Sequence, residues 1–381
     1  MGLTDEQQAF AEAIRDFCSR ECGTREKRQA LTNGGEEAHS TELYGKLAEL
    51  GWTGVSIPEE YGGAGGGIVE QCVYFHELWR GMAPVYGAGS TATVAGCVKR
   101  FGSEEQKQRV LPEIAEGAVM SVSISEPEAG SDVGNVTSRA VRSNGGYVLN
   151  GQKTWCSSAH MATRILVLAR TDKPEKRYQG LTLFDIPADV EGLEIRPIDT
   201  MGGRDVNDIF MTDVEVSEEQ VVGVVGDGFK HIMTGLNGER LVAAAQGLGM
   251  ADRTLEDLLV YVKERRQFGK PIGTFQALRH RIADIATDLQ CARSLTYELA
   301  ELYDEQPDAP ELTRLTSMAK LKVTETAKHA ALEGMQMMGG YGYATEYDME
   351  RHVRVALAPP IYAGTNEIQR DIIAGSYGLK G

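Results

Sequence analysis

Cysteine is scarce in this chain, and the distribution of the few that occur excludes two kinds of structure. The six cysteines include no C-x-x-C pair, and no group of histidines has metal-ligand spacing. We therefore expect reduced, mostly structural thiols, with neither a disulfide framework nor a metal site. The cysteines are Cys18, Cys22, Cys72, Cys97, Cys156 and Cys291.

Long apolar runs are absent as well. No stretch reaches the length that crosses a bilayer, and Met1 leads directly into polar residues. Glu6 also breaks the pattern for N-myristoylation. These absences predict a soluble, cytoplasmic protein.

Positive charge is in deficit. The chain has 39 Lys and Arg residues against 55 Asp and Glu residues, which gives a formal net charge of −16. This balance argues against an electrostatic nucleic-acid binder, although it is compatible with a local basic cleft for a phosphate group.

Hydrophobic periodicity divides the 381 residues into three regions. Apolar residues recur at helical spacing over 4–117, the period changes to two over 119–225, and helical spacing returns after Gly228. We therefore predict a mainly α fold with a central β domain. Its parts are an N-terminal α-helical domain over 1–118, a middle β domain over 119–227 and a C-terminal four-helix bundle over 228–381.

Within these regions the pattern predicts individual elements. Strands are expected at 119–125, 147–151, 164–170, 181–186 and 209–216, and helices at 104–116, 241–263, 275–303, 312–338 and 350–357. Turns are expected at Asn144-Gly145-Gly146 and at Asn150-Gly151, and an exposed hairpin tip at 172–178. The glycine-rich segment 58–67 follows no strand and lacks a closing Lys-Ser/Thr, so we expect a flexible turn rather than a phosphate loop.

The densest pattern is the segment 336–370. Its Q-M-M-G-G-Y-G turn allows positive φ and close backbone approach, which suits either a flat or anionic ligand or a tight structural turn. Pro359 and Pro360 end the preceding helix. Gly364-Thr365 then opens a short helical run whose first N–H groups can hold a phosphate.

Other motifs also have an ordinary explanation beside a functional one. S-I-S-E-P-E-A-G-S-D (123–132) and K-T-W-C-S-S (153–158) are each consistent with a polar turn between strands. E-R-R-Q-F-G-K-P-I (264–272) is consistent with a basic helix C-terminus that meets the helix dipole. In G-L-N-G-E-R (235–240), Asn237 is a plausible N-cap and Glu239 falls in the first helical turn.

Taken together and in this order, these motifs resemble those of the acyl-CoA dehydrogenase family over essentially the whole chain. The family's P-E-x-Y-G-G, T-E-P-x-A-G-S-D, K-x-W-I-T, R-x-x-F-G and Q-x-x-G-G elements all have counterparts. The resemblance implies an FAD-dependent enzyme that desaturates an acyl-CoA thioester and passes electrons to an electron-transferring flavoprotein. It also implies a homotetramer built as a dimer of dimers.

The resemblance further implies site residues. Ser125 and Ser157 would hydrogen-bond the isoalloxazine ring and Trp155 would pack beside it, although serine replaces the family's threonine twice and Cys156 replaces an aliphatic residue. The R-x-x-F-G element would reach the pyrophosphate of a neighbouring subunit's FAD. The implied cofactor-binding residues are Ile124, Ser125, Trp155, Ser157, Arg265, Gln267, Phe268, Gln276, Gln336, Gly339, Gly340, Thr365 and Glu367; the implied substrate-binding residues are Ser131, Asn237, Arg240, Tyr362, Ala363 and Gly364.

One departure concerns the catalytic base. The family usually carries its glutamate in a Y-E-G-T segment, which here is Y-A-G-T with Ala363. In the isovaleryl-CoA and long-chain members the glutamate instead precedes an arginine in a helix, where this chain has Glu239. We therefore expect Glu239 to abstract the α-proton, with burial beside the acyl chain raising a carboxyl pKa that is ordinarily about 4. The backbone N–H of Ala363 can still donate to the developing enolate.

Two other functions share the resemblance. A flavin monooxygenase or oxidase of the same fold would react with oxygen, and Glu239 argues against it. A non-catalytic subunit paired with an active relative would be consistent with Ala363, but the retained cofactor motifs argue against that. The expected substrate is a short branched or otherwise bulky acyl-CoA, with a long straight chain as the main alternative. Val355 stands where the family often has Asp after Arg354, and the sequence offers no explanation for it.

Overall fold

The computed structural model describes residues 2–172 and 178–379, and the chain forms two compact units. Unit 1 contains Met1–Arg28, Gly67–Ala83 and Arg240–Gly381, and unit 2 contains Gln29–Gly66 and Pro84–Glu239. Neither unit is continuous in sequence, so segments far apart in the chain build each core. The domain borders expected at 118/119 and 227/228 stay a prediction.

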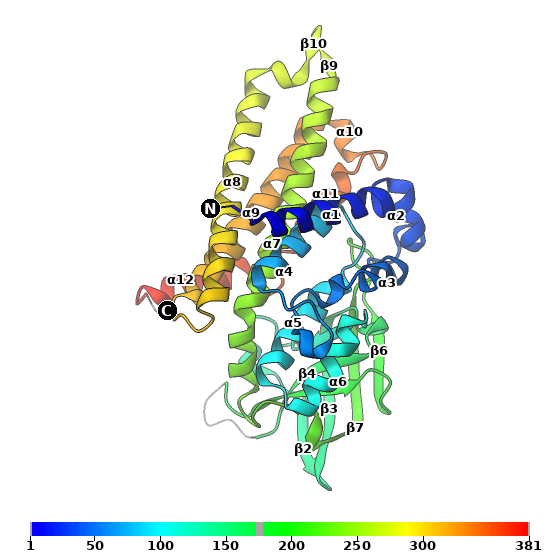
Figure 1. The fold of residues 1–381 in the computed structure, drawn as a ribbon, viewed down its shortest axis with the longest axis vertical. Coiled ribbons are helices and arrows are strands. Elements are labelled where there is room, and N and C mark those ends of the chain that lie inside the picture. The colour runs from blue at the N-terminus through cyan, green and yellow to red at the C-terminus, as the bar shows by residue number, and fades with distance from the viewer. Residues whose placement is uncertain (1, 173–177, 380–381) are drawn as a thin grey trace. The chain divides into compact units, whose positions relative to one another are not determined.

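Unit 1 is helical, as expected for the C-terminal region (Figure 1). The long helices α7, α8 and α9 contribute to one apolar core, which includes Leu258, Ile285 and Ala330. Helices α11 and α12 pack against α9, α1 packs against α4, and α4 packs against α8. The bounds are α1 (Asp5–Cys22), α2 (Arg25–Leu31), α4 (Ile68–Arg80), α7 (Gly228–Glu264), α8 (Gln276–Glu305), α9 (Leu312–Met338), α10 (Gly340–Tyr343), α11 (Met349–Ala356) and α12 (Asn366–Ser376), with η7 (Ile272–Thr274) and the hairpin of β9 (Arg266–Gln267) and β10 (Lys270–Pro271); α2 and α7 each run from one unit into the other.

Two buried histidines hold α7 to its neighbours in unit 1. The Nε2 atom of His76 on α4 lies 2.6 Å from an Asp252 oxygen, and its Nδ1 atom lies 2.9 Å from the Tyr297 hydroxyl on α8. Further along α7, Asp257 lies 2.8 Å from Nε2 of His352 on α11. Buried hydrogen bonds of this kind fix the rotation of a helix. They therefore set the direction in which the C-terminal half of α7 presents its side chains.

Unit 2 is built on an eight-stranded sheet with the order β6-β7-β3-β2-β4-β5-β8, and β1 pairs in parallel with β4. All five predicted strands are present. Three strands of the sheet were missed: β2 and β6, because most of their side chains are exposed or half-buried and give no clear alternation, and β8, because it is only two residues long. The bounds are β1 (Met120–Ser123), β2 (Arg139–Ser143), β3 (Gly146–Ser157), β4 (Arg164–Arg170), β5 (Leu181–Pro187), β6 (Leu193–Pro197), β7 (Val206–Ser217) and β8 (Val221–Val222).

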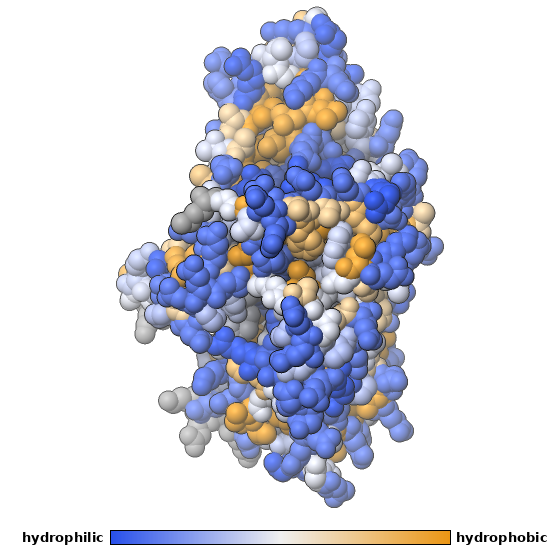
Figure 2. Space-filling view, viewed as in Figure 1, coloured by the Kyte–Doolittle hydropathy of each residue, from blue (hydrophilic) through white to orange (hydrophobic). Residues whose placement is uncertain are grey.

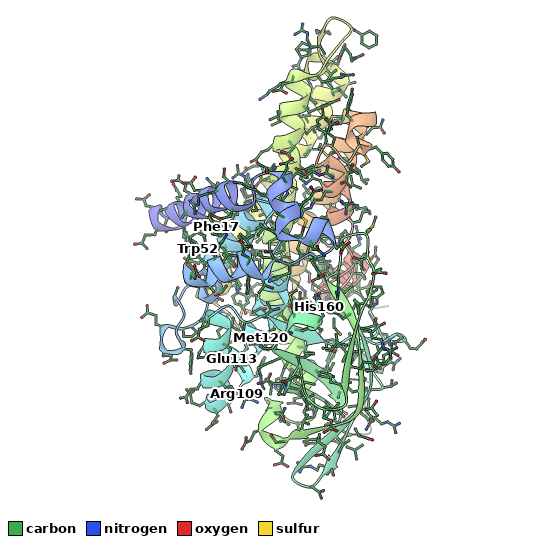
Figure 3. The ribbon with its side chains drawn as sticks, turned by 90° about the vertical axis from the view of Figure 1, so that its right-hand side faces the viewer. Phe17, Trp52, Arg109, Glu113, Met120 and His160 are labelled. Atoms are coloured by element: carbon green, nitrogen blue, oxygen red, sulfur yellow. The ribbon has the colours of Figure 1, made fainter. Side chains whose placement is uncertain are left out.

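Helices cover this sheet. One core joins Val98 and Leu111 of the helices to Leu166 and Leu183 of the sheet. Figure 3 labels Arg109 and Glu113 on α6 close to Met120 at the start of β1. The helices of unit 2 are α3 (Thr41–Glu49), α5 (Gly87–Phe101), α6 (Glu104–Ala115) and the first part of α7, with short turns η1 (Asn33–Gly35), η2 (Trp52–Gly54), η3 (Glu59–Tyr61), η4 (Val133–Asn135), η5 (Ala159–Met161) and η6 (Glu218–Gln220).

The start of α7 corrects one prediction. The helix begins at Gly228, so Asn237 is not an N-cap and Glu239 lies well inside the helix. Gly235 and Gly238 lower the helix propensity of this stretch, which made a later start plausible. The contacts of Ile232 and its neighbours with the core of unit 2 override that preference.

Of the three expected turns that lie within the described residues, two are present and one is wrong. Asn144 and Gly145 both have positive φ, 41° and 82°, and join β2 to β3 in a two-residue hairpin. Asn150-Gly151 is not a turn, because it lies inside β3 at a break in the pairing register with β7. The segment 58–67 is a turn but a tightly bonded one, since a Cβ on Gly63 would lie 2.1 Å from the Ile57 carbonyl oxygen. The hairpin tip expected at 172–178 lies largely outside the described residues, which omit 173–177.

Within residues 2–172 and 178–379, no helix has the length and apolar character needed to cross a membrane. The same residues contain no group of three or more His, Cys, Asp and Glu side chains that could hold a metal ion.

Candidate functional site

Two of the predicted cofactor motifs lie side by side in unit 2. The Thr154 N–H donates to the Ser125 carbonyl oxygen over 3.0 Å, and the Ser121 hydroxyl donates to the Ser157 carbonyl oxygen over 2.8 Å. The segment after β1 therefore runs beside the end of β3. This arrangement places two candidate hydroxyls, Ser125 and Ser157, on neighbouring segments.

Trp155, in the segment that also carries Ser157, has an unusual backbone conformation. Its φ is +59°, at a point where the pairing of β3 with β7 shifts register between Lys153 and Cys156. Such a backbone costs about 1–3 kcal/mol in a residue other than glycine and is concentrated at functional sites. The bulge leaves the indole 61% exposed while the next residue, Cys156, is fully buried. An aromatic face is therefore available to a planar ligand.

A buried ion pair fixes these two segments, and sequence reasoning missed it. Lys153 is fully buried, and its Nζ atom donates to the Ile124 carbonyl oxygen over 3.0 Å and to Glu126 Oε1 over 2.9 Å. Glu126 also accepts from the backbone N–H groups of Thr137 and Ser138, at 2.7 and 2.9 Å. The signal was present as opposite charges inside the S-E-P and K-T-W motifs, in segments otherwise typical of buried strands.

The pKa of Glu126 reflects this environment. Burial alone would raise it, but the ammonium group of Lys153 and the hydrogen bonds from Ser138 and Thr137 lower the pKa to about 2. Burial also lowers the pKa of Lys153 from its ordinary value, against the attraction of Glu126. The four donors around the Glu126 carboxylate keep it ionised.

We predict that Glu126→Gln destabilises the protein strongly, because it leaves the Lys153 ammonium buried without its counter-charge. Breaking a buried pair from one side costs about 3–5 kcal/mol. The folded pKa of Glu126 lies below the unfolded value of about 4.3, so the stabilisation is present above that pH and is lost as the pH falls towards 2. Urea unfolding at pH 7 and pH 4 measures both effects.

The matched control is Glu128→Gln, since Glu128 lies in the same turn but is exposed. It should change the free energy of unfolding by less than about 0.5 kcal/mol. Equal losses for Glu126→Gln and Glu128→Gln would contradict the ion-pair assignment. Lys153→Met combined with Glu126→Gln should recover part of the loss, because no unpaired charge is then buried.

Glu239 lies in the part of α7 that belongs to unit 2. The Sγ atom of Cys97 on α5 lies 3.4 Å from the position that a Cβ on Gly235 would take, one helical turn before Glu239. Burial, with a smaller contribution from the Glu239 charge, raises the pKa of the Cys97 thiol to about 12. The carboxylate thus stands near a neutral, inert thiol and the apolar face that α7 shares with α5.

Other predicted substrate residues are spread over both units. Asn237 is buried on the unit 2 part of α7, and Ser131 is exposed in the turn that follows the S-E-P segment. Arg240, buried at 2% exposure, is the first residue of the last stretch of unit 1. The structure therefore places Asn237 and Glu239 on one helical segment, within a turn of each other.

The loop from Tyr362 to Thr365 lies in unit 1. Ala363 has φ +53° and Gly364 has φ +76°, so the chain passes through two left-handed residues. The Thr365 hydroxyl accepts from the Ile368 N–H over 3.3 Å and so caps α12. Among the described residues, the backbone N–H of Ala363 has no hydrogen-bond acceptor. This amide is therefore available to a ligand.

The basic and glycine-rich motifs of the C-terminal region lie together in unit 1. The Arg265 guanidinium lies over the Tyr341 ring, 5.1 Å from its centroid, and the Tyr261 hydroxyl donates to the Met338 carbonyl oxygen over 3.3 Å. The end of α7 therefore adjoins the end of α9. A Cβ on Gly339 or Gly340 would meet no atom within 4 Å, so both glycines face open space. A backbone that faces open space next to an arginine suits a phosphate group.

A pocket of about 480 Å³ lies beside these motifs. Its lining includes the carboxylates of Asp257, Glu264, Glu346 and Asp348 together with Arg265. Two of these carboxylates, Asp257 and Asp348, pair with cationic side chains. The pocket is thus lined by charges of both signs.

The remaining predicted cofactor residues of unit 1 are exposed. Phe268, at the tip of the β9–β10 hairpin, has φ +51° and is 92% exposed. Gln276 stands at the start of α8, Gln336 in the last turn of α9 and Glu367 in the first turn of α12. The Gln267 side chain donates to the Arg266 carbonyl oxygen over 2.8 Å. Side chains that extend this far into solvent can contact a ligand held by a second copy of the chain.

Comparison with protein-family models gives matches over nearly the whole chain. Residues 4–118 match the acyl-CoA dehydrogenase N-terminal domain, 121–215 the middle domain and 226–378 the C-terminal domain.

Three curated proteins illustrate the sequence similarity. A probable acyl-CoA dehydrogenase, YngJ of Bacillus subtilis, is 36% identical over 98% of both chains. The mitochondrial isovaleryl-CoA dehydrogenase of Solanum tuberosum is 36% identical over 97% of this chain and 90% of its own. The CarC subunit of the caffeyl-CoA reductase-Etf complex of Acetobacterium woodii is 34% identical over 98% of this chain and 99% of its own.

Solved structures are similar over the same length. The acyl-CoA dehydrogenase from Geobacillus kaustophilus superposes with a TM-score of 0.93 at 31% identity, covering 99% of each chain. The FAD complex of PigA superposes with a TM-score of 0.92 at 27% identity, covering all of both chains. With three domain models matched in order and relatives above 30% identity over at least 90% of their length, the chain belongs to the acyl-CoA dehydrogenase family.

Proposed function

We propose that this protein is an FAD-dependent acyl-CoA dehydrogenase that introduces an α,β double bond into an acyl-CoA thioester, with Glu239 as the base. The observation that carries the proposal is the loop at Ala363. Its amide has no acceptor among the described residues and can donate to a thioester oxygen although the usual glutamate side chain is missing. The loop has thus kept the donor while losing the carboxylate.

The residues of each unit, taken separately, fit one part of FAD. In unit 2 the exposed indole of Trp155 and the hydroxyls of Ser125 and Ser157 suit the edge of a flavin ring. In unit 1 Arg265 with Gly339 suits the diphosphate of an FAD held by a neighbouring copy of the chain. When bound, the flavin accepts the hydride that leaves the substrate β-carbon. The Lys153–Glu126 pair keeps the Ile124–Ser125 backbone in place beside it.

Glu239 would take the α-proton. A carboxylate on a helix beside an apolar core and an un-ionised thiol is well placed to act as a general base for a weakly acidic C–H bond. The 36% identity to an isovaleryl-CoA dehydrogenase supports this position, because the resemblance described above implies a glutamate before the helix arginine in that kind of enzyme. In this chain the Y-A-G-T motif has lost its glutamate, and the E-R motif has a glutamate at position 239. This exchange is the reason for assigning Glu239 and Ala363 to one substrate.

The electron acceptor is proposed to be an electron-transferring flavoprotein. The similarity to CarC, a subunit of a complex with Etf, supports this partner. An oxidase or monooxygenase of the same fold would transfer its electrons to oxygen. The two can be separated by following flavin reoxidation with Etf under argon and with air alone.

The proposed substrate is a short branched or otherwise bulky acyl-CoA. Ala363 leaves only a methyl group where most of the family has a glutamate, and this makes room near the α and β carbons. Anaerobic reduction of the purified flavoprotein by a panel of straight and branched acyl-CoAs tests both the reaction and the preference. Reduction by none of them would refute the proposed function; equal rates with butyryl-CoA and isovaleryl-CoA would remove the reason for preferring a branched chain.

We also propose a homotetramer built as a pair of dimers, in which the β9–β10 hairpin contacts a neighbour's FAD. Figure 2 shows hydrophobic surface on the end of unit 1 that carries the long helices. Exposed hydrophobic side chains in this region of the chain include Val260 on α7, Leu332 on α9 and Phe268 at the tip of the β9–β10 hairpin. A surface of this kind favours a second copy of the chain. Full FAD occupancy in a sedimenting monomer would refute the contact in trans.

Arg265→Ala should weaken FAD retention by about 10- to 100-fold, because it removes a charged partner of the diphosphate. The order of preference among acyl-CoAs should not change. Equilibrium dialysis of FAD measures the first effect and steady-state rates the second. Arg314→Ala is the matched control, since Arg314 stacks on Tyr377 in a similar cation–π geometry outside the motifs and should leave FAD affinity unaltered.

A further inference from the structure

Lys320 is a fully buried lysine on α9, and its ammonium group holds the loop that contains Ala363. Its Nζ atom donates to the Gly364 carbonyl oxygen over 2.9 Å and to Asn366 Oδ1 over 3.1 Å. Burying an ammonium group is costly unless it is hydrogen-bonded. A lysine at this place therefore needs a reason beyond packing.

A second donor acts on the same carbonyl groups from α12. The side-chain amide of Gln369, which is fully buried, donates to the Ala363 carbonyl oxygen over 3.2 Å and to the Gly364 carbonyl oxygen over 2.9 Å. The carbonyl oxygens of both left-handed residues are thus bonded from inside the protein.

Asn366 completes the network. Its Oδ1 atom accepts from the Thr324 hydroxyl over 3.0 Å as well as from Lys320, and its Nδ2 atom donates to Glu325 over 3.0 Å. Two turns of α9 are therefore bonded to the first residue of α12, which packs against α9 (Figure 1). Thr365 already caps α12, so these bonds are additional to helix capping.

The contrast between carbonyl and amide groups in this loop is informative. The two carbonyl oxygens at 363 and 364 accept hydrogen bonds, whereas the Ala363 N–H finds no acceptor among the described residues. A left-handed alanine persists only when its surroundings hold it, since the conformation is strained. Donors on the carbonyl side hold the peptide planes and so fix the direction of the amide.

We infer that Lys320, together with Gln369 and Asn366, is a positioning residue that holds the Ala363 amide for the thioester oxygen of the substrate. The inference rests on the proposed function and deepens it. In this inference the Lys320 ammonium group affects catalysis only through the orientation of the Ala363 amide, without contacting substrate or cofactor. Without the ammonium group, the loop keeps its sequence but loses the bond that opposes the strain at Ala363.

Lys320→Met tests the inference, because methionine fills the same volume without a donor. The rate of flavin reduction by isovaleryl-CoA should fall at least ~10-fold, with KM changed far less; complete loss of such a donor typically lowers kcat by about 10²–10³. The matched control is Lys322→Met, two residues further on α9, where the lysine is partly exposed and pairs with Asp288. It should retain the wild-type rate.

The stretching frequency of the thioester carbonyl in a bound ligand distinguishes a positioning role from a purely structural one. A loss of general stability alone would leave this frequency unchanged. The probe is carbonyl-labelled 3-methylbut-2-enoyl-CoA, which cannot be desaturated again in the same way. In the wild type its frequency should lie below that of the free ligand, because the Ala363 amide polarises the carbonyl. In Lys320→Met it should move back towards the free value while the absorption spectrum of bound FAD stays the same.

The outcomes separate the inference about Lys320 from the proposed dehydrogenase function. A wild-type protein that binds the probe with an unshifted carbonyl refutes the inference, as does a Lys320→Met protein with wild-type frequency and rate. Failure of any acyl-CoA to reduce the wild-type flavin refutes the proposed function instead. If Lys320→Met does not fold, Gln369→Leu removes a donor to the same two carbonyl groups and must raise the probe frequency for the inference to stand.

Discussion

Glu239→Gln should slow flavin reduction by at least ~10²-fold while leaving FAD and acyl-CoA binding nearly intact, the usual result when a general base is removed. Glutamine preserves the shape of the side chain and the helix but cannot accept the α-proton. Glu239 lies well inside α7, so the substitution disturbs no helix cap. Anaerobic stopped-flow reduction by isovaleryl-CoA gives the rate, and titration of the flavin spectrum with the enoyl-CoA product gives the affinity.

Glu256→Gln is the matched control, since Glu256 lies on the same helix but is partly exposed and pairs with Arg80. It should reduce its flavin at the wild-type rate. If Glu239→Gln also does so, another residue is the base. A loss of FAD together with activity would point to a structural role for Glu239, and the FAD spectrum distinguishes that case from the loss of a base.

The sequence alone predicted the order of helical and strand regions, because long amphipathic helices and alternating strands leave strong periodic signals. The bounds expected for α9 agree with the structure at both ends, and those for α6 agree within one residue. The start of α7 was wrong because its first turns are stabilised by contacts with the core of unit 2 rather than by local propensity. Such contacts between distant segments leave no local pattern.

The candidate site shows the same division. Motifs located its loops, and the structure adds the groups that hold them: Lys153 with Glu126 in unit 2, and Lys320 with Asn366 in unit 1. Lys153 and Glu126 are 27 positions apart in the sequence, and Lys320 and Asn366 are 46 positions apart. Sequence spacing therefore does not predict either contact. In both cases a buried ammonium group donates to the backbone close to a left-handed residue, Trp155 or Ala363. Strained backbone at the site is thus supported by buried charge.

The pairing around Arg354 also has a physical explanation. The Arg354 guanidinium donates to Glu350 at 2.7 Å, one turn earlier on α11. Arg354 therefore has a carboxylate partner in Glu350, although Val355 stands where the family commonly has an aspartate.

The last prediction asks whether a carboxylate at position 363 can replace the one at 239. In the Glu239→Gln background, Ala363→Glu should restore part of the rate, with the preference shifted towards less bulky acyl chains. Alanine already carries a Cβ at φ +53°, so glutamate adds little further backbone strain, whereas a β-branched residue would add more. The loop amide is unchanged by the substitution and can still donate to the thioester oxygen.

Ala363→Gln in the same background is the control, because it introduces the same shape without a base. It should stay at the rate of Glu239→Gln alone. Recovery with glutamate but not glutamine shows that both positions reach the same α-carbon, which no measurement on either unit alone can establish. If glutamate and glutamine behave alike, a carboxylate at 363 does not reach the α-carbon, and the exchange between the Y-A-G-T and E-R motifs does not explain the chemistry.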